Sequence, residues 1–131
     1  MVNGVRSLFK QRAFTLIEML VVMAIVALLL TIATPRYFGA LDKSKEVVLQ
    51  ENLRTMRHVL DKFLADKGRY PRTLDELVEA GYLRAIPVDP MTESSQTWVI
   101  DLSRRQDRSG ISNVHSGAPG ATHAGVQYGQ L

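Results

Sequence analysis

The sequence predicts an α+β fold: one long N-terminal helix, with a transmembrane half and an amphipathic half, packs on a small antiparallel β-sheet head. Three observations predict this fold. Residues 19–33 form an apolar run without charge, a helical period of apolar residues continues toward residue 64, and two short strand-like runs lie near the C-terminus. The 131 residues suffice for one domain.

The first half of the helix has the length and composition of a membrane span. Residues 14–33 contain a single charged residue, Glu18, and about 20 mostly apolar residues are enough to cross a bilayer core as a helix. The basic residues Arg6, Lys10 and Arg12 precede this run. The positive-inside rule therefore predicts a single-pass protein with a cytoplasmic N-terminus and the C-terminal part outside.

An ordinary secretory signal peptide is the alternative for this segment. Residues 20–30 would be its apolar region, and the small residues at 31–33 would provide a cleavage site. Two observations count against this alternative. Glu18 stands between the basic residues and the apolar core, and the sequence after Ala33 continues with a helical pattern.

The second half of the helix is amphipathic and should support the head. Pro35 follows the apolar run, and we expect it to kink or interrupt the helix locally, since proline has no N–H and clashes with the preceding turn. Gly68 is a plausible C-terminal stop. Apolar residues recur at spacings of three and four at Tyr37, Phe38, Leu41, Val48, Leu53, Met56, Val59, Leu60, Phe63 and Leu64, with charged residues on the other face.

The head should contain a short helix, a hairpin and an irregular tail. Thr73 followed by Glu76 predicts a helix start, and Gly81 predicts its end. Residues 97–102 and 111–115 are expected to be strands joined by a polar link with three arginines. The Gly- and Ala-rich residues 116–131 should form an irregular or partly disordered end, with Val126 and Tyr128 anchoring it.

Composition and charge exclude several functions. The chain has no cysteine, so it contains neither disulfides nor thiolate chemistry. The net charge of +3 resides in residues 1–13, and the remainder holds equal numbers of basic and acidic side chains. No dense basic patch remains for binding phosphates, so we expect no nucleic-acid partner.

A catalytic role finds no support in the residues. His58, His115 and His123 are scattered, and the last two lack a nearby acidic residue in the sequence, which makes them weak metal ligands. Asp75 and Glu76 are adjacent, so on a helix they diverge by about 100° and form no acid–base pair. We therefore expect no enzyme activity, no metal site and no cofactor. Trp98 is expected to be a core or interface anchor.

Residues Phe14-Thr15-Leu16-Ile17-Glu18, after a basic leader and before an apolar run, resemble the processing motif of the type IV pilin-like family. This family includes type IV pilins and the pseudopilins of type II secretion systems. The resemblance implies that a prepilin peptidase cuts between Ala13 and Phe14 and that the new Phe14 amine is N-methylated. The family usually has glycine before the cut, and alanine is the closest substitute in size.

The resemblance also suggests why the apolar run contains Glu18. A carboxylate in a transmembrane segment is costly and usually marks function. Cleavage would create a positive partner, the α-amine of Phe14, and Glu18 of an incoming subunit could pair with that amine on a neighbour. Thr15 could bond a backbone carbonyl or Glu18. The alternative is that Glu18 only extends to the lipid headgroups.

Residues 69–90 resemble the segment that follows the long helix in major pseudopilins. Many members of that group bind calcium near the C-terminus, where calcium favours acidic oxygen ligands. This chain has no Asp or Glu after Asp107, so a calcium site is not expected.

The resemblance implies four segments: a cleaved leader at 1–13, a transmembrane and filament-core helix at 14–35, an amphipathic helix at 36–67, and a periplasmic head at 68–131. It implies a subunit of a periplasmic filament, anchored in the bacterial inner membrane. Implied partners are other copies of the chain, prepilin peptidase, minor pseudopilins, and the inner-membrane assembly platform with its ATPase. Two alternatives remain. One is a surface pilin, which the absence of cysteine disfavours. The other is a signal-anchored periplasmic protein, for which the sequence offers no site residues.

Overall fold

The computed structural model describes residues 13–131 and divides into two units, one ending at Phe38 and the other spanning Gly39–Leu131. The N-terminal unit is helical from Leu16 onward. The second unit, which we call the head, holds the remainder of that helix together with all other helices and strands. The basic residues Arg6, Lys10 and Arg12 and most of the expected leader lie outside the described residues.

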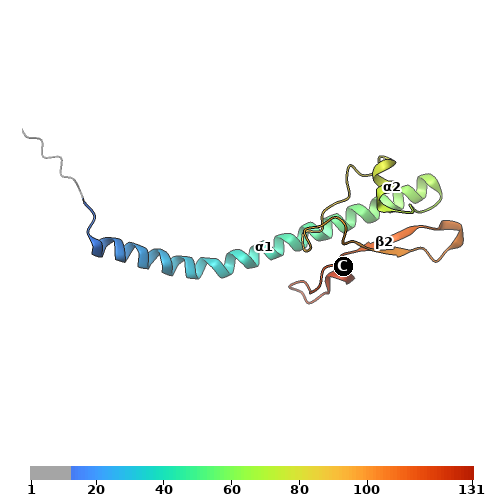
Figure 1. Ribbon diagram of the computed structural model, residues 1–131. Coiled ribbons are helices and arrows are strands. Elements are labelled where there is room, and N and C mark those ends of the chain that lie inside the picture. The colour runs from blue at the N-terminus through green and yellow to red at the C-terminus, as the bar shows by residue number, and fades with distance from the viewer. Residues whose placement is uncertain (1–12) are drawn as a thin grey trace, which may run out of the picture. The chain divides into compact units, whose positions relative to one another are not determined.

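Helix α1 spans Leu16–Lys67 and contributes to both units (Figure 1). It was expected to begin at residue 14, but Thr15 caps it, so helical geometry starts at Leu16. The helix ends at Gly68, whose φ of 72° lies in the left-handed region that glycine adopts without strain. The N–H of Gly68 donates to the carbonyl of Leu64 at 2.8 Å, which satisfies one of the free carbonyls at the helix end.

The core of the head forms along one face of α1. The buried apolar side chains recur at spacings of three and four, as expected for a helix that covers a small head. Tyr37, Phe38, Leu41 and Val48 were expected on this face, but all four are exposed, and the buried apolar residues of α1 begin only at Leu49. The buried apolar residues of α1 are Leu49, Leu53, Met56, Val59, Leu60 and Phe63.

Helix α2, Leu74–Glu79, starts as the sequence predicts. The Thr73 hydroxyl accepts a hydrogen bond from the N–H of Glu76 at 3.2 Å. In a complete capping box the Glu side chain would return to the N–H of Thr73. Here it accepts instead from the N–H of Arg72 at 2.6 Å and from the guanidinium of Arg69. Leu77 is fully buried. The Thr73 cap therefore fixes the start of α2, and Leu77 attaches the helix to the core.

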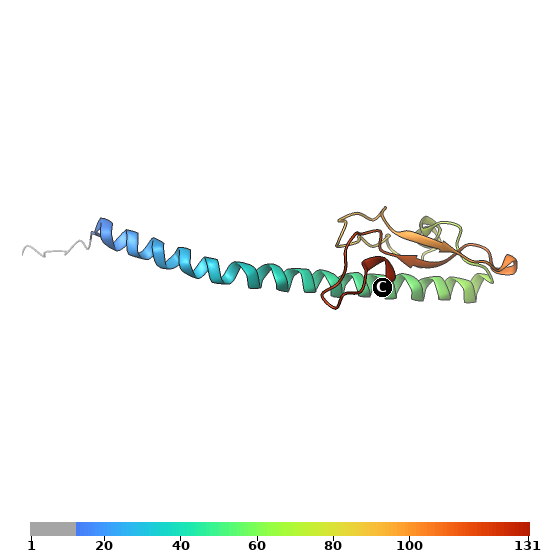
Figure 2. The same ribbon diagram turned by 90° about the horizontal axis from the view of Figure 1, so that it is seen from below.

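The sheet consists of two antiparallel strands, β1 at Val99–Leu102 and β2 at Ile111–His115. Both lie alongside the C-terminal part of α1 (Figure 2). Strand β1 begins two residues later than expected, because its first residue, Val99, already pairs with the last residue of β2, His115. A short 3-10 turn, Gln106–Arg108, lies within the link between the strands.

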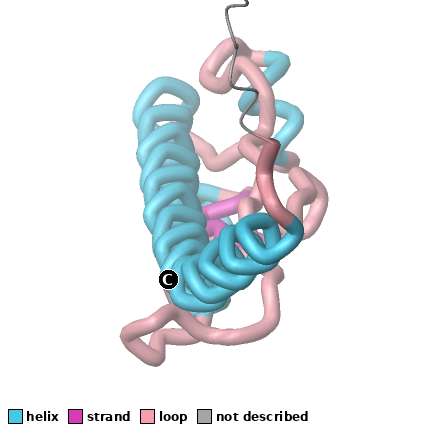
Figure 3. The backbone as a smooth tube through the Cα atoms, turned by 90° about the vertical axis from the view of Figure 1, so that its left-hand side faces the viewer, coloured by secondary structure: helices cyan, strands magenta, loops and turns pink. Residues whose placement is uncertain are grey.

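Loops and turns make up most of the head outside α1 and α2 (Figure 3). Trp98 is nearly buried, and its indole N–H donates to the carbonyl of Pro87 at 2.8 Å, which confirms a core role. The tail is irregular but ordered, and it ends in a 3-10 turn at Tyr128–Gln130. Tyr128 packs on the core, whereas Val126 is 41% exposed and does not anchor the tail. The expected α+β fold, with a helix packed on a small antiparallel sheet, is confirmed.

Candidate functional site

Thr15 organises the start of α1. Its hydroxyl oxygen accepts a hydrogen bond from the backbone N–H of Glu18 at 3.1 Å, and its carbonyl accepts from the N–H of Met19 at 3.1 Å. A bond between Thr15 and Glu18 was expected, and its partner in the structure is the backbone N–H of Glu18. Thr15 and Glu18 also have the spacing of a capping box, which is the sequence signal for this cap.

The Glu18 carboxylate is exposed in the first turn of α1. Within residues 13–131 it makes neither an ion pair nor a hydrogen bond. A negative charge is stabilised at this end of a helix by the helix dipole. The geometry therefore leaves the carboxylate oxygens available to a positively charged group on another molecule.

The surface around Glu18 is apolar and uncovered. Every residue from Ala13 to Phe38 is exposed, with Phe14 at 68% and Leu16 at 85%. By length and composition this part of α1 can cross a membrane, and none of its apolar window is buried within the chain. Soluble monomers rarely expose such a contiguous apolar surface, so lipid or another protein must cover it.

Pro35 lies inside α1, and the helix continues past it. Proline removes the N–H that would bond the carbonyl of Thr31. Two threonines before it donate their hydroxyls to carbonyls one turn back, Thr31 to Ala27 at 2.8 Å and Thr34 to Leu30. Such side-chain bonds often bend helices, so the segment is locally weakened. A kink at Pro35 stays a prediction.

The head is held to α1 by Arg57. Its Nε donates to Oδ1 of Asn113 at 2.9 Å, and its Nη2 donates to the carbonyl of Val114 at 2.9 Å. The same Nη2 donates to the carbonyl oxygen of Leu131. One guanidinium therefore joins α1, β2 and the end of the tail, a role that the planar fork of arginine suits.

A second link joins α1 to the tail through Glu46 and His123. The buried Glu46 accepts from the backbone N–H of His123 at 3.0 Å and contacts its ring Nδ1 at 2.8 Å. The hydrogen bond from the His123 side chain is the main reason that the pKa of Glu46 is lowered, and the charge of Lys43 adds to it. The pKa of Tyr128 is raised, mainly by burial and further by the charges of Glu46 and Asp42.

Asp89 is a structural residue that the sequence analysis missed. No pattern in the sequence marks its side chain, yet that side chain is fully buried. One carboxylate oxygen accepts from the N–H of Met91 at 2.8 Å, and the other from the hydroxyl of Ser116. It thereby ties the loop before β1 to the start of the tail. The Asp-Pro pair gives no sequence signal for a partner 27 residues away.

The three histidines lie at separate places in the head, and two of them contact a carboxylate. His58 is exposed on α1, His115 contacts Oδ2 of Asp101 at 2.8 Å through Nε2, and His123 contacts Glu46. The described part of the chain contains no group of three or more His, Asp or Glu side chains positioned for a metal ion. These contacts fasten strand to strand and tail to helix.

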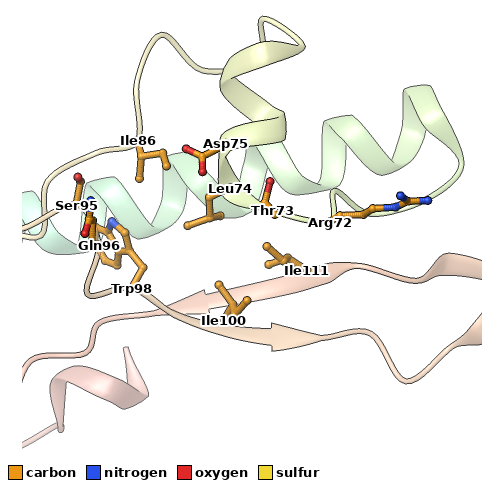
Figure 4. A pocket seen from close by; sticks show the side chains of 10 residues that line it. All are labelled: Arg72, Thr73, Leu74, Asp75, Ile86, Ser95, Gln96, Trp98, Ile100 and Ile111. Atoms are coloured by element: carbon orange, nitrogen blue, oxygen red, sulfur yellow. The ribbon is translucent and has the colours of Figure 1, made fainter.

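A cavity of about 390 Å³ lies between α2 and the strands (Figure 4). Its apolar lining comes from Leu74, Ile86, Trp98, Ile100 and Ile111, and Asp75 is the one acidic residue in it. The residues that line it include no histidine.

Comparison with known proteins identifies relatives along most of the chain. Residues 8–34 match the family model described as a prokaryotic N-terminal methylation motif, of which 8–12 lie outside the described residues. The chain is 31% identical over 101 residues to type II secretion system core protein G of Escherichia coli K12, covering 65% of this chain and 70% of the relative. It is 32% identical over 97 residues to the protein of that name in Klebsiella pneumoniae, with coverage of 62% and 69%.

The corresponding protein of Pseudomonas aeruginosa is 31% identical over 97 residues, covering 62% of this chain and 68% of the relative. No solved structure gives a significant match.

Proposed function

The chain belongs to the family of type II secretion system core protein G, and we infer from this that it is a membrane-anchored pseudopilin subunit of such a system. One observation carries the inference: a prepilin-type methylation motif opens an apolar helix that the chain itself leaves uncovered. Membership in this family favours a structural, self-assembling role over catalysis. Copies of the chain would cover one another's helices in a pseudopilus.

We propose that prepilin peptidase cuts between Ala13 and Phe14. Residues 13–15 are not helical and are exposed, and α1 begins only at Leu16. Exposed, irregular backbone is the usual place for proteolysis, so the bond to be cut is accessible while the helix after it is already formed. The small side chain of Ala13 suits a site that normally takes glycine.

Docking is then a matter of pairing two charges. The new amine of Phe14 would lie at the positive end of the dipole of α1, which disfavours a cation there. The Glu18 carboxylate lies in the first turn with no partner in the described chain. An amine from one copy and a carboxylate from the next would neutralise each other in the apolar filament core. Sliding the copies would leave a buried charge unpaired, so the pair would fix the axial register.

The orientation of the subunit follows from the charges before the helix. Arg6, Lys10 and Arg12 lie before the apolar segment, so we propose that the N-terminus is cytoplasmic and the head is periplasmic, with the span at 14–35 in the inner membrane. Partners in this proposal are prepilin peptidase, minor pseudopilins and the inner-membrane assembly platform. The segments 1–13, 36–67 and 68–131 would serve as leader, amphipathic support and head.

Mass spectrometry of the mature N-terminus tests the proposal. The full chain is produced in a host with a type II secretion system, and the N-terminal peptide is sequenced. The expected result is a chain that begins with methylated Phe14. A chain that begins at Thr34 would show that residues 1–33 are an ordinary signal peptide, and a chain that keeps Ala13 would show that no processing occurs.

A further inference from the structure

The link between the strands presents a concentration of positive charge. Arg104, Arg105 and Arg108 are all exposed within residues 103–109, which contain one acidic residue, Asp107. Arg108 lies 3.8 Å from Asp107, and the described residues provide no ion pair for the other two. The three arginines line a hollow of about 850 Å³ together with Tyr70 and Asp101, and the Asp101 carboxylate already contacts His115. We call Arg104, Arg105 and Arg108 the basic tip.

Helix α2 presents the opposite charge. The Glu76 carboxylate already has partners within the chain: the Arg69 guanidinium donates to it at 2.6 Å, and the backbone N–H of Arg72 also donates to it at 2.6 Å. Asp75 and Glu79 are exposed and form no ion pair within residues 13–131. Their spacing of four places both carboxylates on one face of the helix. We call Asp75 and Glu79 the acidic face.

Each surface is destabilised by its own like charges. Carboxylates four residues apart on a helix repel each other, and so do three guanidinium groups in one short link. Within residues 13–131 no ion pair joins the two surfaces. A second copy would supply each surface with charges of the opposite sign.

We propose that the basic tip of one copy docks against the acidic face of the next copy in the assembled filament. The contact joins two different surfaces, so it is heterologous, and such contacts propagate into open helical assemblies rather than closing as a dimer. The proposal rests on the assembly put forward above and names a head-to-head contact for it. Opposite charges would also favour the correct approach of an incoming subunit.

Cysteine cross-linking tests the contact. Because the chain has no cysteine of its own, any disulfide must come from the introduced residues. The full chain carrying Asp75→Cys and Arg105→Cys keeps Glu79, Arg104 and Arg108. Filaments assembled from it should form a disulfide ladder of dimers, trimers and longer species on oxidation. Each single variant should form none. A matched control pairs Arg105→Cys with Ala124→Cys, an exposed position at a turn in the tail, and should give no ladder.

Charge reversal provides the second test. In the cross-linkable chain, Arg104→Glu with Arg108→Glu should lower the ladder yield by about tenfold or more, because like charges then face each other. Adding Glu79→Arg to that chain should restore it. Lys62→Glu with Lys67→Glu, an equal charge change at exposed positions of α1, should leave the ladder intact.

The outcomes separate this contact from the proposed function. Filaments that form without a ladder, that give only a dimer, or that cross-link equally through Ala124 would overturn the contact and leave the pseudopilin role standing. Failure of the added Glu79→Arg substitution to restore the ladder would also overturn the proposed contact. Failure of the unaltered chain to form any filament, with its secretion system present, would overturn the pseudopilin role and the contact with it.

Discussion

Glu46 of α1 and His123 of the tail lie 77 residues apart in the sequence, yet the Glu46 carboxylate accepts the His123 backbone N–H at 3.0 Å and meets its ring Nδ1 at 2.8 Å. This contact holds a Gly- and Ala-rich segment against a helix. The charge of Lys43 adds to the lowering of the Glu46 pKa, and the charge of Glu46 in turn helps to raise the pKa of Tyr128. The charge of one buried carboxylate therefore contributes to holding the tail, beside the contacts of Arg57, Asp89 and Tyr128.

This dependence predicts a stability difference that varies with pH. The pKa of Glu46 is lowered in the folded chain, so its contribution is present above its unfolded pKa and is lost as the pH falls through the lowered value. The free energy of unfolding of the full chain in detergent should thus exceed that of Glu46→Gln most at about pH 7, and the difference should shrink in acid. Urea titrations at several pH values measure it. A difference that grows on acidification would contradict the assignment.

The half-buried Arg57 should contribute strongly to stability. Replacing it with Ala removes hydrogen bonds to Asn113 and Val114, and we expect a loss of about 2 kcal/mol in the free energy of unfolding. Arg57→Lys should recover little, since an ammonium does not reproduce the fork. The control is Arg54→Ala, whose ion pair with Glu51 is exposed and should be worth less than about 1 kcal/mol. Equal losses in both variants would contradict this role.

Asp89 should be essential to the loop before β1. In Asp89→Ala the Ser116 hydroxyl and the Met91 N–H lose their buried acceptor, which should lower the free energy of unfolding by about 3 kcal/mol. Asp89→Asn keeps one acceptor oxygen and should lose less. Thermal unfolding of the three chains gives the order. The prediction fails if the Asn and Ala variants are equally destabilised.

Processing should depend on the size of residue 13. Ala13→Gly should be cleaved at least as fast as the natural chain, and Ala13→Leu should be cleaved more slowly, because the site is expected to exclude larger side chains. Pulse labelling followed by electrophoresis separates precursor from mature chain. Equal rates for the Leu variant would remove this account of Ala13.

Much of the fold could be predicted from local signals. Thr73 and Gly81 predicted the two ends of α2, and β-branched residues predicted the two strands, of which only β1 begins two residues later than expected. The apolar period of α1 predicted the core from Leu53 onward. These features are set by residues a few positions apart, which a pattern in the sequence records directly.

The features that sequence reasoning missed depend on distant partners. The buried role of Asp89 depends on its hydrogen bond with Ser116, which is distant in the sequence. The tail was expected to be partly disordered, but hydrogen bonds to Glu46 and Arg57 hold it. Val126 was expected to anchor the tail because it is apolar, but polar contacts hold the tail and leave Val126 exposed. Near the start of α1, the spacing of Thr15 and Glu18 could have predicted the helix cap, but the two residues were considered only as part of an apolar segment.

The filament yield of Glu18→Leu tests the central claim most directly. The variant should insert in the membrane at the normal level, because it only removes a charge from an apolar run. Its filament yield should fall by about tenfold or more, since each ~1.4 kcal/mol of lost association energy is a factor of ten. Met19→Leu, an apolar exchange at the next position, serves as the control. A normal filament yield from Glu18→Leu would show that this carboxylate pairs with no neighbour and would contradict the account.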